Sequence, residues 1–459
     1  MKTYQIAVVG GGPGGYVAAI RAAKEGKTVA LIEADHLGGT CLNRGCIPSK
    51  TLLRHAEVIE DIKAAKNWGI ETGSLTLSLD KMMARKDQVI QRLRAGIGGL
   101  LKAGKVEVYR GIGTVQADKT IIISGTEDQT IKAESIILAT GSAPFVPPIP
   151  GTDQVSYHTS DTIFGITKIP ESIVIIGGGV IGVEFACIFE SLGTKVTVVE
   201  MADRLVPMED PDASAALRKA LQKKNISTLT ETKVESLATG KDGHVVNITD
   251  PAGNPGQLHC EEILIAVGRR PNVSGIADLG LKMNGPFVEV NDFMETSIPG
   301  IYAVGDLIGG WQLAHVASAE GTIAALNASG QRTPINYHVV PRCVYTQPEI
   351  ASVGLTEEEA RKKGYSVKVE VYKHAANGKA MAIDHTDGFV KIIADQKYGE
   401  ILGVLLVGSH VTEMIATPSA FMHLEATVEE MANMIYPHPA VSETMMEVAA
   451  SWLGKGIHS

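Results

Sequence analysis

Residues 4–33 read YQIAVVGGGPGGYVAAIRAAKEGKTVALIE, and this stretch decides the fold of the first part of the chain. An apolar run leads into a GxGxxG turn at Gly10, Gly12 and Gly15, a segment with helical apolar periodicity follows, and a second apolar run ends at Glu33. This order predicts a strand, a turn, a helix and a strand of a dinucleotide-binding unit. The glycines let the backbone approach a pyrophosphate, and the helix N-terminus supplies N–H groups with partial positive charge.

Residues 172–200 repeat this pattern as SIVIIGGGVIGVEFACIFESLGTKVTVVE, with Gly177, Gly179 and Gly182 in the turn and Glu200 at the end. In both copies the first glycine precedes the glutamate by 23 residues. A lone GxGxxG is weak, but the full strand–turn–helix–strand–acid context in both copies predicts two dinucleotide sites. The spacing does not say which site holds FAD and which holds NAD. A carboxylate at Glu200 would accept a bond from a free 2′-hydroxyl and repel a 2′-phosphate, which favours NAD over NADP.

Two cysteines, Cys41 and Cys46, follow the first unit within the segment GGTCLNRGCIPSK at 38–50. In a regular helix, Cα atoms five positions apart are about 8.6 Å apart, whereas a disulfide needs roughly 4.4–6.8 Å. The two sulfurs can bond only if the backbone leaves the regular helix between them, and Gly45 permits this. Thiols beside a bound redox cofactor indicate electron transfer between that cofactor and sulfur. The alternative is a pair of unrelated buried thiols.

Length and composition narrow the class of protein. With 459 residues, two to four domains are expected, and 44% hydrophobic with 20% charged residues is ordinary for a globular protein. The net charge of −9 without a basic stripe predicts no nucleic-acid partner. No apolar run reaches the ~18 residues of a membrane span, and nothing at the N-terminus directs export. Five cysteines form no disulfide scaffold, so we expect a cytoplasmic protein, and no metal-binding residues are predicted.

The fold class that these patterns predict is α/β, with two Rossmann-like dinucleotide-binding domains followed by an α+β C-terminal domain. From about residue 337 the pattern changes to strands, and helical stretches follow. The expected C-terminal strands cover 367–372, 389–394 and 401–408, and one helical stretch covers 419–434.

The segment GGTCLNRGCIPSKTLL at 38–53 resembles the redox-active segment of the flavin-dependent pyridine nucleotide–disulfide oxidoreductases, and the resemblance spans the whole chain. It implies that Cys41 and Cys46 form a redox disulfide and that Lys50 lies at the flavin N5, paired with Glu184. Without the resemblance, these two charges read as unrelated and solvated. The resemblance also implies four parts, namely an FAD-binding domain 1–142, an NAD-binding domain 143–268, a segment 269–336 that completes the FAD domain, and a dimerisation domain 337–459.

Further positions match cofactor contacts of that family, and the resemblance alone implies their roles. These positions are Gly113, Thr140, Gly141, Val234, Gly268, Asp306 and Ala314. From the residues alone, Asp306 is better interpreted as a turn-forming aspartate after glycine. Arg204, four residues after Glu200, could soften the preference for NAD, but it is better interpreted as a surface residue.

A general base is expected at His438, which lies within YPHPAVSE at 436–443, five residues before Glu443. Histidine can take a thiol proton near neutral pH, and a carboxylate can orient it. The residues alone favour a rigid proline-bounded loop with a chance histidine. The segment resembles the family motif HPTLSE, in which the His–Glu pair reaches the active site across a homodimer interface. Ala440, Val441 and Tyr436 depart from the family pattern, whereas His438 and Glu443 match it.

Within the superfamily the sequence is most similar to the dihydrolipoamide dehydrogenases, although glutathione and mercuric reductases share the two-cysteine frame. Glu200 argues against the NADPH-using glutathione type. The C-terminus lacks the extra cysteine pair of mercuric reductase, and two cysteines distinguish the chain from transhydrogenases and from single-cysteine NADH oxidases. The resemblance implies oxidation of dihydrolipoamide on lipoyl domains of a 2-oxoacid dehydrogenase or glycine-cleavage complex, with reduction of NAD. A regulatory or structural flavin- and NAD-binding protein is the alternative.

Overall fold

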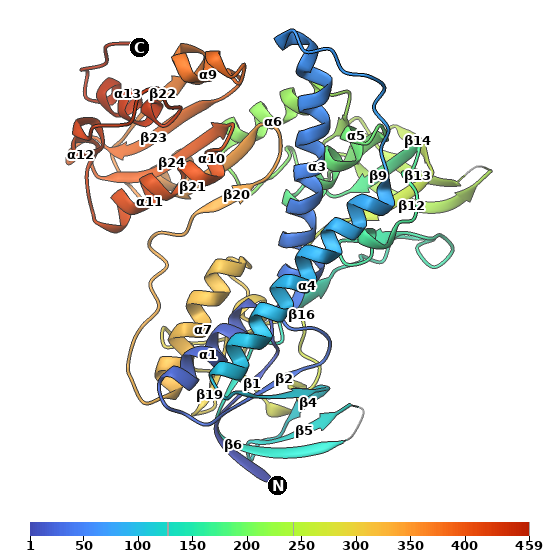
Figure 1. Ribbon diagram of the computed structural model, residues 1–459, viewed down its shortest axis with the longest axis vertical. Coiled ribbons are helices and arrows are strands. Elements are labelled where there is room, and N and C mark those ends of the chain that lie inside the picture. The colour runs from blue at the N-terminus through green and yellow to red at the C-terminus, as the bar shows by residue number, and fades with distance from the viewer. Residues whose placement is uncertain (126–127, 242, 459) are drawn as a thin grey trace.

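The computed structural model describes residues 1–125, 128–241 and 243–458. Figure 1 shows three regions: the N-terminal unit at the bottom, the second glycine-turn unit at the upper right, and the C-terminal domain at the upper left. Two long helices, α3 (Cys46–Ala64) and α4 (Leu79–Ala103), run between the lower and upper regions. None of the helices in the described ranges is both long enough and apolar enough to cross a membrane.

The first sheet has the strand order β3-β2-β1-β6-β5-β4, and β19 also pairs with β6. Its strands are β1 (Lys2–Val9), β2 (Val29–Glu33), β3 (Glu107–Arg110), β4 (Ile112–Val115), β5 (Thr120–Ser124), β6 (Gln129–Leu138) and β19 (Ile301–Ala303). β1 is parallel to β2 and β6, and β19 is parallel to β6. The chain therefore returns to the first sheet after the second unit. Helices α1 (Pro13–Lys24) and α7 (Ala314–Ala328) approach closely, because a Cβ at Gly321 would be 2.2 Å from the carbonyl oxygen of Gly14.

The second unit contains a wholly parallel sheet with the order β11-β10-β9-β15-β8. Its strands are β8 (His158–Thr159), β9 (Ser172–Ile176), β10 (Lys195–Val199), β11 (Ser227–Leu229) and β15 (Glu262–Ile265). Helix α5 (Val180–Ser191) follows β9, and α6 (Pro211–Lys223) precedes β11. A separate antiparallel sheet consists of β12 (Lys233–Gly240), β13 (Gly243–Thr249) and β14 (Pro255–Cys260). Both predicted strand–turn–helix–strand units are therefore confirmed.

Two short strands join the units. β7 (Ser142–Pro144) leaves the first unit and pairs antiparallel with β16 (Arg269–Pro271), which leaves the second. This pairing brings the chain segments that connect the two units side by side, and it fixes Arg269 opposite Pro144. A smaller hairpin pairs β17 (Met283–Asn284) with β18 (Phe287–Val288).

The C-terminal domain contains an antiparallel sheet with the order β20-β21-β24-β23-β22. Its strands are β20 (Arg342–Val344), β21 (Glu349–Gly354), β22 (Val367–Lys373), β23 (Phe389–Asp395) and β24 (Ile401–Gly408). Its helices are α8 (Glu357–Lys362), α9 (Gly378–Ala382), α10 (Val411–Met414), α11 (Ala416–His423), α12 (Val428–Asn433) and α13 (Glu443–Trp452). The fold class predicted from the sequence, mixed α/β with Rossmann-like sheets and an α+β C-terminal domain, is confirmed, and the three expected C-terminal strands are present.

The single helical stretch expected over 419–434 is wrong. The chain leaves α11 after His423, Glu425 adopts a left-handed φ of +56°, and a new helix, α12, begins after Thr427. Thr427 and Glu430 form a capping box, in which each side chain bonds the other's backbone N–H. Apolar spacing continued across the break, so periodicity alone could not detect it.

Candidate functional site

The first glycine turn joins β1 to α1 and leaves one side of the backbone open. Gly10 has a φ of +106°, and a Cβ there would be 2.1 Å from the carbonyl oxygen of Ala139. A Cβ at Gly15 would be 1.8 Å from the carbonyl oxygen of Gly10. At Gly12, in contrast, an added Cβ would come no closer than 3.8 Å to any described residue beyond its chain neighbours. The open side lies where α1 begins, so the turn fits a pyrophosphate held by helix N–H groups.

The second glycine turn repeats this geometry between β9 and α5. A Cβ at Gly177, whose φ is +111°, would be 2.4 Å from the carbonyl oxygen of Ala266. A Cβ at Gly182 would be 1.9 Å from the carbonyl oxygen of Gly177. At Gly179, an added Cβ would have no heavy atom of the described residues within 4 Å, apart from its chain neighbours. The residues present therefore fit a second dinucleotide.

Glu33 ends β2 with its carboxylate held by two backbone donors. One oxygen accepts a hydrogen bond from the N–H of Gly11 at 2.6 Å, and the other accepts one from the N–H of Asp35 at 2.8 Å. Burial raises the pKa of Glu33, against the effect of the bond from Gly11. The side chain is oriented beside the glycine turn, where a ribose would lie.

Glu200 occupies the equivalent position after β10. Its two oxygens accept hydrogen bonds from the N–H groups of Gly178 and Ala202, both at 2.6 Å. Arg204 lies 3.2 Å from Asp203, with which it forms an ion pair. The charge of Arg204 is therefore partnered by Asp203, and the two backbone bonds hold the Glu200 carboxylate beside the second glycine turn.

The two cysteines lie on either side of a break between two helices. Helix α2 (Gly39–Arg44) contains Cys41, and α3 begins at Cys46. Gly45, between the helices, has φ −134° and ψ −106°, and a Cβ there would be 3.2 Å from the carbonyl oxygen of Thr40. The departure from regular helix that the sequence predicted at Gly45 is confirmed.

The two thiols are free, and the interaction between them shifts the pKa of each. Interaction with the Cys41 thiol, together with the positive charge of Lys50, lowers the pKa of Cys46, although burial acts in the opposite direction. The same interaction and burial raise the pKa of Cys41. The directions of the two pKa shifts are therefore opposite, and Cys46 is the sulfur of the pair that loses its proton more readily.

Lys50, one turn of α3 beyond Cys46, forms an ion pair with Glu184 of α5. The Nζ atom lies 3.0 and 2.9 Å from the two carboxylate oxygens. The Glu184 side chain is only 6% exposed, whereas that of Lys50 is 32% exposed. The contact ties the helix that carries Cys46 to the second unit, and the buried carboxylate depends on Lys50 for neutralisation.

Tyr345 belongs to the same cluster, and the sequence analysis missed it. Its N–H donates to Glu184 at 3.1 Å, and its ring centroid lies 4.4 Å from the Nζ atom of Lys50. The residue comes from the C-terminal domain, 161 positions after Glu184. It belongs to no motif, so no signal in the sequence could have placed it here.

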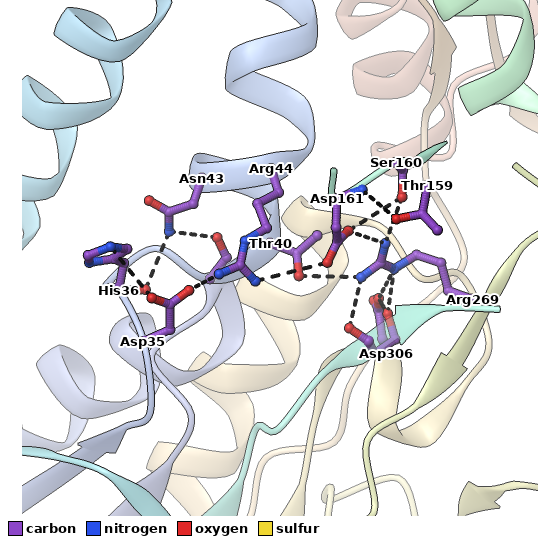
Figure 2. A network of polar contacts seen from close by, with 12 residues as sticks. Asp35, His36, Thr40, Asn43, Arg44, Thr159, Ser160, Asp161, Arg269 and Asp306 are labelled. Carbon is purple, nitrogen blue, oxygen red and sulfur yellow. Dashed lines mark hydrogen bonds and ion pairs between the residues drawn. The ribbon is translucent and has the colours of Figure 1, made fainter. Parts of the chain in front are cut away.

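Asp306 lies in a 3-10 turn, Gly305–Ile308, just after β19. Its carboxylate accepts a hydrogen bond from the hydroxyl of Ser142 and lies 3.9 Å from the Nε atom of Arg269. Figure 2 shows these contacts as part of a larger polar network. Ala314 is the first residue of α7, which starts soon after this turn.

Other positions matched by the resemblance have mixed surroundings. Gly113 lies in β4, and a Cβ there would meet Val9 at 3.1 Å, which is a packing reason for glycine. Val234 is half-buried in β12. The hydroxyl of Thr140 donates to the carbonyl oxygen of Asn272 at 2.6 Å. These contacts orient the segments but do not by themselves identify a ligand.

Gly141 and Gly268 are more open. Both have a positive φ, +68° for Gly141 and +116° for Gly268. At either glycine, an added Cβ would have no heavy atom of the described residues within 4 Å, apart from its chain neighbours. Gly141 follows β6 and Gly268 follows β15, and both strands have parallel neighbours in their sheets. Open backbone at the carboxyl end of a parallel strand is where doubly wound sheets bind their ligands.

His438 and Glu443 form a second pair. The Nδ1 atom of His438 lies 2.9 Å from one oxygen of Glu443, whose other oxygen accepts the N–H of Ala440 at 2.8 Å. Burial acts to raise the pKa of Glu443, but these two bonds hold it below its usual value. Tyr436, which replaces a frequent family histidine, is buried in the domain core. The His438 side chain is 81% exposed.

The two reactive groups lie in different regions of the chain. Figure 1 shows α13, which begins at Glu443, on the outer side of the C-terminal domain, well separated from α3. The structure therefore brings together the cysteine pair with Lys50 and Glu184, and brings together His438 with Glu443, but it does not join these two groups within one chain.

Comparisons with known proteins agree with this organisation. Residues 4–321 match the family model described as pyridine nucleotide-disulphide oxidoreductase, and residues 340–449 match the dimerisation domain of that family. A dihydrolipoyl dehydrogenase of Bacillus subtilis is 41% identical, covering 99% of both chains, and one of Thermus scotoductus is 39% identical, covering 100% of this chain and 99% of that one. Among solved structures, LpdA from Mycobacterium tuberculosis has a TM-score of 0.89 at 27% identity, covering 98% of this chain and 99% of that one. A Cu(II) complex of the flavoprotein disulfide reductase RclA from Escherichia coli has a TM-score of 0.88 at 28% identity, covering 98% and 100%.

Proposed function

Because the chain belongs to the pyridine nucleotide-disulphide oxidoreductase family, an FAD-dependent family that uses NAD(P), we propose that it oxidises protein-bound dihydrolipoamide to lipoamide and reduces NAD. The observation that carries the proposal is the Cys41–Cys46 pair, which lies on either side of the helix break at Gly45, with the ammonium of Lys50 one turn further along α3. Such a pair closes as a disulfide and opens as one thiol and one thiolate, which is the change that a dithiol substrate drives.

We assign one cofactor to each of the two glycine turns. FAD would occupy the first turn, with Glu33 at its ribose and Asp306, Ala314, Lys50, Gly113, Thr140 and Gly141 around the remainder. NAD would occupy the second turn, with Glu200 at its ribose and Val234 and Gly268 nearby. The domain limits that we propose are 1–142 and 269–336 for FAD, 143–268 for NAD, and 337–459 for dimerisation; the return of β19 to the first sheet supports this.

The chain's own residues perform the thiol chemistry. His438 takes a proton from one substrate thiol, and the resulting thiolate attacks Cys41 in the oxidised pair. The Cys41–Cys46 bond breaks, and Cys46 leaves as the thiolate that its lowered pKa favours. The second substrate thiol then displaces Cys41 from the mixed disulfide, which releases lipoamide and returns a proton to Cys41. Bound FAD supplies the route by which the electron pair passes from Cys46 to NAD.

The separation of His438 from the cysteines supports a homodimer. The family's dimerisation domain covers 340–449, and Ile435, three residues before His438, is 95% exposed. A large exposed apolar side chain beside a proposed base suits an interface with a second copy. We propose that His438 and Glu443 of one subunit act on Cys41 and Cys46 of its partner.

Co-expression of two inactive variants tests the shared site. A His438→Gln chain and a Cys41→Ser chain should each be nearly inactive alone, and the heterodimer should regain one intact site of two. Purified heterodimer with no more activity than either parent would show that the base acts within its own subunit.

An anaerobic titration with dihydrolipoamide tests the reaction itself. Two-electron reduction should produce a long-wavelength charge-transfer absorbance, and turnover should require NAD. The dithiol partners would be lipoyl domains of a multienzyme complex, and we place the enzyme in the cytoplasm, where lasting structural disulfides are rare. A protein that binds both cofactors but shows neither the absorbance nor turnover would support a regulatory or structural role instead.

A further inference from the structure

A row of alternating charges crosses from the first unit to the second (Figure 2). The row lies beside the segment 40–46, which contains Cys41 and Cys46 and which we call the thiol turn. Asp35 pairs with Arg44, and Arg44 lies 4.0 Å from Asp161. Asp161 pairs in turn with Arg269 at 3.2 Å, and Arg269 lies 3.9 Å from Asp306. Asp161 is thus the single carboxylate between two guanidinium groups within this row.

The row has members from both units. Arg44 lies between the two cysteines in sequence, at the end of α2. Asp161 follows β8 of the second unit, and Arg269 begins β16, directly after Gly268. The side chains of Asp161 and Arg269 are only 20% and 13% exposed. Ion pairs at this depth are screened less than surface pairs, so their charges act on nearby groups.

Arg269 also reaches the immediate neighbour of the reactive sulfur. Its guanidinium contacts the hydroxyl of Thr40, the residue before Cys41, at 3.4 Å. It donates to the hydroxyl and carbonyl oxygens of Ser142 at 2.7 and 2.8 Å, and to the hydroxyl of Ser160 at 3.2 Å. Arg269 therefore binds both units at once, and Asp161 is the carboxylate of the second unit that partners it.

We propose that Asp161 is a positioning residue that holds the thiol turn against the second unit and neutralises Arg44 and Arg269, and thereby sets how readily the cysteine–flavin centre is reduced. The inference rests on the proposed function, because it concerns the reduction of that centre. Without the carboxylate of Asp161, the guanidinium groups of Arg44 and Arg269 would have no negative charge between them.

The sign of the effect follows from charge. Two-electron reduction opens the cysteine pair and places a negative charge on Cys46, so one more unit of positive charge nearby favours the reduced form. For a unit charge roughly 10–15 Å away and an effective dielectric constant of about 20–40, the Coulomb energy corresponds to about a three- to seventeenfold change in the equilibrium constant. Removal of Arg44 should shift the same equilibrium in the opposite direction.

The experiment measures the NADH/NAD⁺ ratio at which the FAD-loaded enzyme is half reduced, read from absorbance under anaerobic conditions. Asp161→Asn should lower that ratio about three- to seventeenfold, whereas Arg44→Gln should raise it. Asp161→Glu keeps the charge and should stay near the wild-type ratio. Asp118→Asn is the matched control, because Asp118 forms an exposed ion pair with Lys132 in the first unit; it should change nothing.

Each outcome decides a separate point. If the wild-type enzyme shows no charge-transfer absorbance with dihydrolipoamide, the proposed function fails, whatever the variants do. If wild type shows it and Asp161→Asn keeps the wild-type ratio, the inference is overturned. Equal shifts in Asp161→Asn and Asp161→Glu also overturn it, because the glutamate keeps the negative charge. Shifts of the same sign in Asp161→Asn and Arg44→Gln overturn it as well, because the two substitutions remove charges of opposite sign. If Asp161→Asn loses its flavin, the sign of the Arg44→Gln shift decides alone.

Discussion

The buried histidine His374 in the C-terminal domain predicts how the free energy of unfolding of the protein depends on pH. The residue is fully buried at the start of a 3-10 turn after β22, and neither ring nitrogen has a hydrogen-bond partner among the residues that the structure describes. Its ring fills the space over two glycines: a Cβ at Gly388 would be 2.8 Å from the ring, and one at Gly408 would be 2.5 Å from it. A buried imidazole without partners must remain neutral.

Burial lowers the pKa of folded His374 from the ordinary 6.5 to about 4. Between these values the unfolded chain binds a proton that the folded chain does not, so the free energy of unfolding falls as the pH drops. The free energy of unfolding is therefore at its full value above pH 6.5, and the contribution from neutral His374 is lost progressively towards pH 4. The full difference corresponds to about 3 kcal/mol, and between pH 7.5 and 5.5 the loss is about 1.3 kcal/mol.

The perturbation is His374→Phe, which removes the titrating group and keeps an aromatic ring. Urea unfolding at pH 7.5 and 5.5, at one protein concentration, gives the stability difference between the two pH values for each protein. The variant should lose about 1.3 kcal/mol less than wild type on acidification, whatever its packing costs at pH 7.5, because a packing change is present at both pH values. His423→Phe, at an exposed helical position, is the control. Identical pH dependence in wild type and His374→Phe would refute the reasoning.

Three further predictions concern the site. Glu200→Arg should move the kcat/KM preference from NAD towards NADP, because a 2′-phosphate is no longer repelled; equal values for both cofactors in wild type would contradict the placement of this residue. Lys50→Met should destabilise the protein by about 1–3 kcal/mol, since it leaves the buried carboxylate of Glu184 unpaired. The double variant with Glu184→Gln should recover part of this loss in a thermodynamic cycle, and strict additivity would argue against the pair. Cys46→Ser should abolish the charge-transfer absorbance and Cys41→Ser should show it without added reductant; a band retained in Cys46→Ser would reassign the flavin-facing sulfur.

Features that depend on a few consecutive residues could be predicted well. The glycine turns follow from steric contacts between each turn and the strand ends beside it, so the GxGxxG spacing specifies them. Gly45 was predictable for the same reason, since five helical positions hold two sulfurs too far apart to bond. The break between α11 and α12 was missed because apolar periodicity runs through it, although the capping pair Thr427 and Glu430 was a usable signal.

Contacts between distant segments could not be predicted from pattern. Tyr345 reaches Glu184 from another domain, and Asp161 meets Arg269 across 108 positions. Neither Tyr345 nor Asp161 belongs to a motif, and each is placed by the packing of whole sheets and helices. The pairing of Lys50 with Glu184 was expected only through the family resemblance, and the structure supplies the ion pair.

The sequence by itself determined the two strand–turn–helix–strand units and the helix break between the cysteines, because each follows from local backbone sterics. The class of reaction was indicated by the resemblance of the cysteine segment to a known family. Tertiary structure alone decided which charges meet: it placed Asp161 between two arginines, Tyr345 against the Lys50–Glu184 pair, and His438 on a surface away from the thiols. The physical reason is that long-range contacts depend on the register and crossing of packed elements, which residues of many types can satisfy, whereas a turn in which a Cβ would meet backbone, as at Gly10 and Gly177, accepts only glycine.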